Sequence, residues 1–187
     1  MLHNMRLKDS PFNKIKMGKK TIELRLMDEK RSLVKPNDFI LFTNIDTEEI
    51  IETKVICIHK FNNFEELYQN FCKVELGYSL EETAKPDDML EYYSKEEQEK
   101  YGVVGIEIKY IDISKIYNNI TNDLEIIDIY KNIEDKENIE KSYAYHNYTH
   151  VLNVNKIIEY ILNAFKYDEN FIKKAKIAGI LHDTGVI

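Results

Sequence analysis

Cysteine, proline, glycine and long apolar runs are all scarce in this chain. Its 187 residues include two Cys, three Pro, six Gly and no Trp. Because Cys57 and Cys72 form no CxxC pair, the sequence argues against a disulfide framework and favours a reducing compartment. No apolar run approaches the roughly 20 residues of a membrane span, and residues 1–12 hold no apolar signal segment. We therefore expect a cytoplasmic protein without membrane contact, containing one full domain and part of another.

Positive charge is concentrated at one end of the chain. The net charge is −7, yet residues 1–35 hold ten Lys or Arg against four Asp or Glu. Residues 36–110 hold seven against seventeen. A basic segment on an acidic protein indicates either a surface that faces phosphate groups or an ordinary solvated face, and charge alone does not separate the two.

Residues 1–110 combine strand-type alternation with short helical patterns. Ser10 and Pro11 mark the start of a helix, as its cap and first residue, and Gly18 marks its end. Further helices are expected over 63–73 and near 87–100. The alternating segments predict strands at Thr21–Met27, Phe39–Thr43, Ile50–Phe61 and Val103–Tyr110. Since strands bracket helices without a βαβ rhythm, the sequence predicts an α+β domain with a curled, partly closed sheet.

The strand predicted after Gly18 has one polar face. Thr21, Glu23 and Arg25 alternate with apolar residues, so their side chains are expected on the same side of the sheet. Arginine offers a planar fork to a phosphate or a base edge, and a lysine such as Lys20 offers a point charge. Glu23 either accepts from an exocyclic amine or holds Arg25 in place. The alternative is a salt-bridged face on a barrel strand, without a ligand.

Three motifs follow one another in this region: Gly18-Lys19-Lys20-Thr21-x-Glu23-x-Arg25, Pro36-Asn37-Asp38 and Tyr101-Gly102-Val103. In this order they resemble an ASCH domain, a member of the PUA-like superfamily, over residues 4–110. The resemblance implies a PUA-like β-barrel with flanking helices and a cleft lined by the Gly-Lys loop and the strand after it. It also implies an RNA or nucleotide-like ligand, bound by Lys19, Lys20, Thr21, Glu23 and Arg25.

The motif departs from one catalytic branch of that family. ASCH-like amidohydrolases use a Lys followed three residues later by a nucleophilic Thr. Here Glu23 stands three residues after Lys20, and the nearby hydroxyl belongs to Thr21. A carboxylate does not replace that Thr without changing the covalent intermediate and its base. We therefore do not expect the amidohydrolase activity, whereas cleavage of RNA through its 2′-OH stays open.

The C-terminal region holds four metal-capable side chains, His146, His150, His182 and Asp183. The first two are four residues apart and share a helical face. Their order, with His182 and Asp183 adjacent, resembles the HD superfamily of metal-dependent phosphohydrolases. The resemblance implies metal ligation by His150, His182 and Asp183, with His146 as a catalytic acid. These ligands suit Zn, Mn, Fe or Ni. The alternative is a pair of packed helices with hydrogen-bonded histidines.

Residues 111–187 are expected to be all-α, with a connecting helical segment at 111–140 and an incomplete HD-like fragment at 141–187. A helix over 147–165 carries one apolar stripe, formed by Val151, Val154, Ile158, Ile161 and Phe165. If the next helix packs antiparallel to it, through a turn at Lys166–Asn170, then His150 and His182 come together.

The sequence ends before the helices that supply a further Asp ligand and the pocket walls in HD enzymes. We therefore expect at most weak metal binding, no phosphohydrolase turnover, and a homodimer formed through unpartnered helix faces. The sequence thus predicts an RNA- or nucleotide-binding ASCH module followed by an inactive, truncated HD fragment. The alternative is an enzyme, either an HD phosphohydrolase completed by a longer chain or a partner, or an RNA-cleaving ASCH domain.

Overall fold

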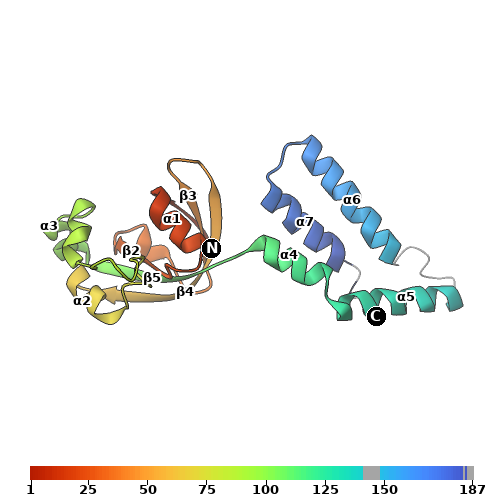
Figure 1. Cartoon of the computed structure of the whole chain (residues 1–187), viewed down its shortest axis with the longest axis horizontal. Coiled ribbons are helices and arrows are strands. Elements are labelled where there is room, and N and C mark those ends of the chain that lie inside the picture. The colour runs from red at the N-terminus through yellow and green to blue at the C-terminus, as the bar shows by residue number, and fades with distance from the viewer. Residues whose placement is uncertain (141–147, 183, 185–187) are drawn as a thin grey trace. The chain divides into compact units, whose positions relative to one another are not determined.

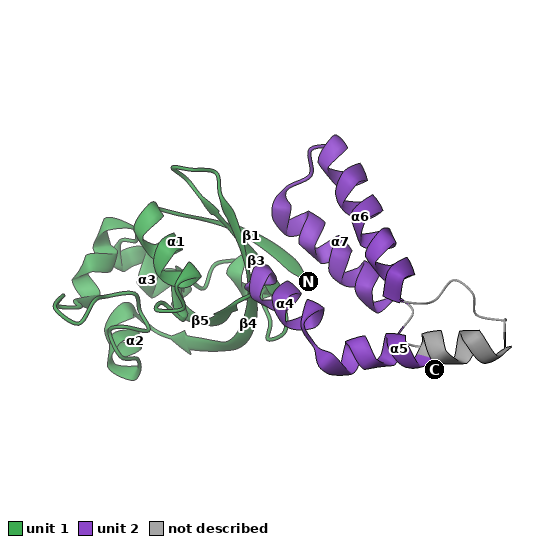
Figure 2. Ribbon diagram, turned by 45° about the vertical axis from the view of Figure 1, so that its right-hand side comes forward, with its two compact units in different colours: residues 1–111 green, residues 112–187 purple. Residues whose placement is uncertain are grey.

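The structure is a computed structural model that describes residues 1–140, 148–182 and 184, without the side chains of residues 133–140. The chain forms two compact units, residues 1–111 and 112–187, which Figure 2 shows in green and purple. Among the helices in the described part of the chain, none is long and apolar enough to cross a membrane.

Unit 1 is built on a five-stranded mixed sheet that curls into a half barrel (Figure 1). Its strands are β1 (Leu2–Leu7), β2 (Ile22–Leu26), β3 (Phe39–Asn44), β4 (Ile50–Phe61) and β5 (Val103–Tyr110). Its helices are α1 (Asp9–Lys16), α2 (Phe64–Asn70) and α3 (Lys95–Tyr101). The strand order is β1-β3-β4-β5-β2, in which β1 runs parallel to β3 and the other neighbours are antiparallel. The α+β prediction is confirmed.

The two faces of this sheet are covered by different helices. Helix α1 buries Phe12 and Ile15 among side chains of β3, β4 and β5. On the other face, α2 buries Phe64 and Leu67 against Ile22 and other apolar residues of β2. Because side chains alternate along a strand, the residues of β2 that lie between its apolar ones face the α1 side of the sheet.

Glycine and capping residues in the sequence mark most ends of the helices in unit 1. Gly18 closes the turn after α1 with φ of 71°, a conformation that glycine adopts without strain. Asn63 caps α2 by accepting a hydrogen bond from the Glu66 N–H, 2.9 Å away. The prediction of Ser10 as a cap is wrong, because α1 already begins at Asp9 and Lys8 precedes it without a side-chain cap. Helix α2 ends at Asn70, before the predicted residue 73.

Strand β1 was not predicted from the sequence. It lies at an edge of the sheet and pairs with β3, with Leu2 opposite Phe39. Only Met5 and Leu7 of its side chains are buried. An edge strand needs apolar residues on one face alone, and the polar residues His3, Asn4 and Arg6 interrupt the pattern that identifies longer strands.

Unit 2 is helical in its described part, with α4 (Ile113–Thr121), α5 (Leu124–Glu140), α6 (Tyr148–Ala164) and α7 (Glu169–Leu181). Its small core holds Tyr130, Val151 and Ile180, and the Tyr130 hydroxyl donates to the Ile180 carbonyl. Helices α6 and α7 pack side by side (Figure 1). The apolar stripe predicted for α6 is buried at Val151 but exposed at Ile161 and Phe165.

Candidate functional site

A cleft of about 370 Å³ lies in unit 1 between β2, the start of α1 and residues 68–93, here called the cover segment. The cover segment is acidic, with six Asp or Glu against two Lys. The lining includes five basic residues, Arg6, Lys8, Lys14, Lys20 and Arg25, and four tyrosines, Tyr68, Tyr78, Tyr92 and Tyr93. Glu23 and Glu82 add carboxylates. A cleft of this composition combines positive charge with flat aromatic surfaces.

Strand β2 brings Glu23 and Arg25 into the cleft. Glu23 pairs with Ile106 in the sheet register, on the face that α1 covers. Only 3% of Glu23 is exposed. Its Oε1 lies 2.9 Å from Nη2 of Arg25, and its Oε2 lies 3.5 Å from Nζ of Lys20. A buried carboxylate therefore sits between two cations, which offset the cost of burying its charge.

Lys20 folds back into the cleft wall. Its ammonium donates to the carbonyl oxygens of Ile22 (2.8 Å) and Leu76 (3.0 Å). Burial lowers the pKa of this ammonium, and the Glu23 carboxylate acts in the opposite direction. Gly77 leaves room for the lysine stem, since a Cβ there would lie 3.0 Å from Cδ of Lys20. Lys20 thus ties the cover segment to β2 and balances Glu23.

Arg25 is held at three points. Nη1 donates to the Tyr93 hydroxyl at 3.2 Å, and Nη2 donates to the Arg6 carbonyl at 3.1 Å while it contacts Glu23. Its Nε is buried and has no hydrogen-bond partner among the described residues. Since β1 and β2 are the two edge strands of the sheet, the bond to Arg6 joins the edges of the half barrel across the cleft.

Ion pairs between α1 and the cover segment surround the cleft. Lys8 Nζ lies 2.7 Å from Glu91 and 3.2 Å from the Tyr92 hydroxyl. Lys14 lies 3.7 Å from Glu82. Lys8 and both carboxylates are largely exposed and Lys14 is half-buried, so each pair contributes little to stability and exchanges its partner readily.

Two tyrosines of the cover segment, Tyr68 and Tyr78, form a hydrogen-bonded chain with Asp88. The hydroxyls of Tyr68 and Tyr78 are 2.8 Å apart, and Tyr78 donates to Asp88 at 3.0 Å. Burial raises the pKa of the Tyr78 hydroxyl well above its ordinary value, and Tyr68 and Asp88 add to that effect. Tyr78 therefore stays a neutral donor at physiological pH.

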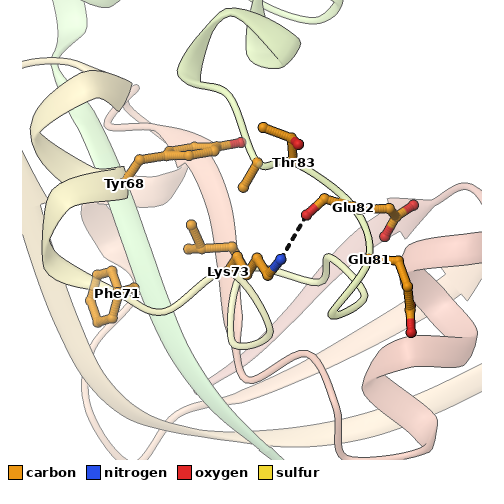
Figure 3. A pocket seen from close by; sticks show the side chains of 8 residues that line it. Tyr68, Phe71, Lys73, Glu81, Glu82 and Thr83 are labelled. Atoms are coloured by element: carbon orange, nitrogen blue, oxygen red, sulfur yellow. Dashed lines mark hydrogen bonds between the residues drawn. The ribbon is translucent and has the colours of Figure 1, made fainter.

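A second hollow, of about 410 Å³, is lined by the cover segment itself, between Tyr68 and Ala84 (Figure 3). It shares Tyr68, Leu76 and Glu82 with the cleft. Lys73 donates to the carbonyl of Glu82 at 2.8 Å, the contact dashed in Figure 3, and to that of Leu80 at 2.6 Å. The buried Lys20 and the more exposed Lys73 therefore both donate to backbone carbonyls of the cover segment, and these bonds hold the shape of the cleft wall.

The cleft contains Lys20, Glu23 and Arg25 of the five binding residues that the resemblance implied. Lys19 lines a different hollow beside α1. Thr21 lies outside the cleft lining, and its backbone N–H donates to the Glu75 carbonyl at 3.0 Å. Lys8, Lys14 and the tyrosines are cleft residues that were not predicted from the sequence. The excess of basic residues over 1–35 was the signal for the lysines, whereas no local pattern marked the tyrosines.

In unit 2, the structure brings together two of the predicted metal ligands. His150 stands in the first turn of α6 and His182 follows the end of α7, with their ring centroids 5.5 Å apart. Nδ1 of His182 is 2.8 Å from the Gly179 carbonyl. His146 and Asp183 lie outside the described residues, so their assigned roles stay predictions.

Three solved structures are similar to part of this chain. A crystal structure of the hypothetical protein PH0355 matches with 33% identity and a TM-score of 0.52, over 59% of this chain and 100% of that one. Protein PF0455 from Pyrococcus furiosus matches with 33% identity and a TM-score of 0.46, over 60% and 99% of the two chains. A ZmASCH variant from Zymomonas mobilis matches with 14% identity and a TM-score of 0.37, over 63% and 77%.

No functionally curated protein matches the chain. A family model does match it: the ASCH domain aligns with residues 5–112, which is more than half of the sequence and close to the extent of unit 1. The HD-like resemblance of the C-terminal region has no counterpart in these matches and stays a prediction. The chain belongs to the ASCH domain family.

Proposed function

We propose that unit 1 binds single-stranded RNA or a nucleotide in the cleft between β2, α1 and the cover segment. The observation that carries the proposal is the buried group of Lys20, Glu23 and Arg25 at the base of a cleft with basic and tyrosine walls. A buried ion network gives a fold little net stability compared with apolar packing. Such groups in a cleft are more often part of a functional site.

The chemistry of the walls suits a nucleotide. Tyrosine rings provide faces on which bases stack, at about 1–3 kcal/mol per base. Glu23 has acceptor capacity beyond its two ion pairs and would accept from the exocyclic amine of a base. Lys8 and Lys14 would bind phosphate, because their present partners are exposed carboxylates that an anionic ligand replaces at low cost.

Two lysines of α1 give a matched test. Lys14 lines the cleft, whereas Lys16 points elsewhere and pairs with Glu49. We expect Lys14→Ala to weaken binding of a fluorescent single-stranded RNA several-fold and to reduce the slope of log affinity against log salt by about one. Fluorescence anisotropy over a salt series measures both quantities. Lys16→Ala should match the wild type.

Arg25→Ala should weaken binding further, since it removes the fork at the cleft base, and circular dichroism checks that the variant is folded. Equal affinity of wild type, Lys14→Ala and Arg25→Ala at low salt would remove the proposal. Loss of RNA during incubation, detected on a denaturing gel and abolished by Arg25→Ala, would instead favour the RNA-cleaving alternative.

A second candidate function concerns unit 2. We propose that His150 and His182 bind a divalent transition metal, on the strength of their 5.5 Å ring separation. A carbonyl partner on Nδ1, as Gly179 provides for His182, is the usual way to orient a metal-ligating imidazole. Metal analysis of protein purified without added metal, and a phosphoester panel with Mn²⁺ and Ni²⁺, test this function. Phosphoester turnover by the wild type that is lost in His182→Ala would establish the enzyme alternative. A metal content of His182→Ala identical to that of the wild type would exclude the site.

A further inference from the structure

Three side chains with metal-binding chemistry lie together on the face of the sheet opposite the cleft. Cys57 and His59 are two residues apart in β4 and therefore share a face. Glu107 of β5 is paired with Cys57 in the register. On the other side of β5, Glu107 is paired with Ile22 of β2. The Ile22 side chain packs against α2. The group thus belongs to the α2 face, whereas Glu23 of the cleft belongs to the α1 face.

The donor atoms of the three residues are already close. A sulfur, an imidazole nitrogen and a carboxylate oxygen lie within 4.8 Å of one another. Nε2 of His59 is 3.0 Å from Oε2 of Glu107. Ligand atoms around a four-coordinate zinc ion are about 3.5 Å apart, given metal–ligand bonds of about 2.0–2.3 Å. Small side-chain rotations therefore suffice to form a site, without movement of the strands.

The backbone around the group is irregular in a way that produces this arrangement. The β4–β5 register shifts between Val55 and Cys57, where β4 carries a bulge. The bulge puts Cys57, rather than Ile56, opposite Glu107 and so adds the thiol to the His59–Glu107 pair. Bulges commonly redirect a side chain toward a functional position.

Packing limits the freedom of the His59 ring. The ring of Phe71 meets it edge-on, with centroids 5.1 Å apart. Phe71 reaches this place because Gly105, the register partner of His59, has no side chain: a Cβ there would lie 3.3 Å from the Phe71 ring. The side chains of His59 and Glu107 are still 32% and 39% exposed. An ion can therefore reach the group, and water can fill a fourth position.

We propose that Cys57, His59 and Glu107 bind a thiophilic divalent transition metal ion such as Zn²⁺. A thiolate and an imidazole select this class of ion over Mg²⁺ or Ca²⁺, which prefer oxygen ligands alone. Binding forms a metal–sulfur bond and releases the thiol proton to solvent. The ring nitrogen of His59 that faces Glu107 coordinates the ion, and the ring proton resides on the other nitrogen. Affinity falls as the pH decreases, because protons compete for sulfur and nitrogen.

We use Co²⁺ as the probe for this site. The full chain is purified with a chelator, dialysed to remove the chelator, and kept reduced with a phosphine. Coordination by Cys57 produces a thiolate-to-Co²⁺ charge-transfer band in the near ultraviolet, which saturates at one ion per chain and is displaced by Zn²⁺. Cys57→Ser should abolish the band. Cys72→Ser, which changes the other cysteine, is the matched control and should retain it. His182→Ala should also retain it, since the histidine pair of unit 2 has no thiol.

His59→Ala and Glu107→Gln should each weaken cobalt binding by about tenfold or more, in line with the loss of a supporting or direct ligand. A second readout does not depend on variants: Zn²⁺ should slow alkylation of Cys57 by iodoacetamide and leave Cys72 in the same molecule unprotected. Absence of the band in the wild type, a band that survives Cys57→Ser, or equal alkylation of Cys57 with and without Zn²⁺ would each overturn the proposal.

Discussion

At the residue scale, the polar face of β2 shows how far the alternation of a strand predicts a site. The sequence predicted that Glu23 and Arg25 share a face, and both line the cleft. It did not predict that Lys20 turns back to the Leu76 carbonyl, because that contact joins residues far apart in the chain. Nor did it show that Thr21, one residue before the start of β2, lies outside the cleft lining.

Lys20 should be a stability residue as well as a cleft residue. Lys20→Met removes the ammonium that serves Glu23 and two backbone carbonyls. Breaking one side of a buried ion pair costs about 3–5 kcal/mol, and the remaining Arg25–Glu23 pair should keep the loss near the lower value. Urea unfolding of the wild type and the variant measures the difference. Lys19→Met, at an exposed neighbouring position, is the control and should change stability by less than about 0.5 kcal/mol.

At the element scale, sequence patterns identified the helices of unit 2 better than their packing. The apolar stripe of α6 was predicted, yet its C-terminal half is exposed in the described part of unit 2. A stripe shows which face a helix tends to bury but not whether a partner covers all of it. The close approach of α6 to α7 depends on Gly179, and a glycine within a helical pattern does not by itself reveal such a contact.

Gly179→Ala tests the close packing of α6 against α7. A Cβ at this position would lie 2.7 Å from Cδ1 of Ile158 and 2.8 Å from Oδ1 of Asn155. Alanine gains about 1 kcal/mol in helix propensity, whereas overpacking costs about 1–3 kcal/mol, so we expect a net loss. Hydrogen exchange of α6 and α7 peptides should become faster. Ala178→Ser, at an exposed position of the same helix, should leave exchange nearly unchanged, and slower exchange in Gly179→Ala would contradict the packing described for these helices.

At the scale of the whole molecule, the two units differ in how completely they bury a core. Unit 1 has two apolar clusters on the two faces of its sheet, whereas the cluster of unit 2 contains three buried residues among those described. The structure of PH0355 matches over 100% of its length but over 59% of this chain, so a chain of about the extent of unit 1 forms a complete fold.

Residues 1–111 produced alone should therefore unfold cooperatively in urea, with a steep transition by circular dichroism. Residues 112–187 produced alone should show a broad transition of low stability, because the few buried side chains in the described part of this unit do not offset the entropy of ordering the helices. A cooperative transition for 112–187 together with none for 1–111 would reverse this expectation.

The exposed end of α6 makes self-association the expected behaviour of the full chain. Ile157, Ile161 and Phe165 recur at intervals of four residues and are all exposed, which forms an apolar strip along one helix face. We expect light scattering during size-exclusion chromatography to show a concentration-dependent dimer. Ile157→Glu with Ile161→Glu should shift it to monomer, whereas Met17→Glu, an exposed apolar position of unit 1, should not. A monomer at high concentration would exclude the dimer.

The bond from Arg25 to the Arg6 carbonyl has a consequence for solubility. A half barrel leaves two edge strands with unpaired backbone groups, and such edges can recruit strands from other molecules and start aggregation. Arg25 occupies one edge carbonyl of β1 from its position on the opposite edge strand. The Arg25 guanidinium therefore both shapes the cleft and covers part of a strand edge that would otherwise be open to pairing with another molecule. A substitution of Arg25 is therefore expected to leave the Arg6 carbonyl open to strands of other molecules, unless another group covers it.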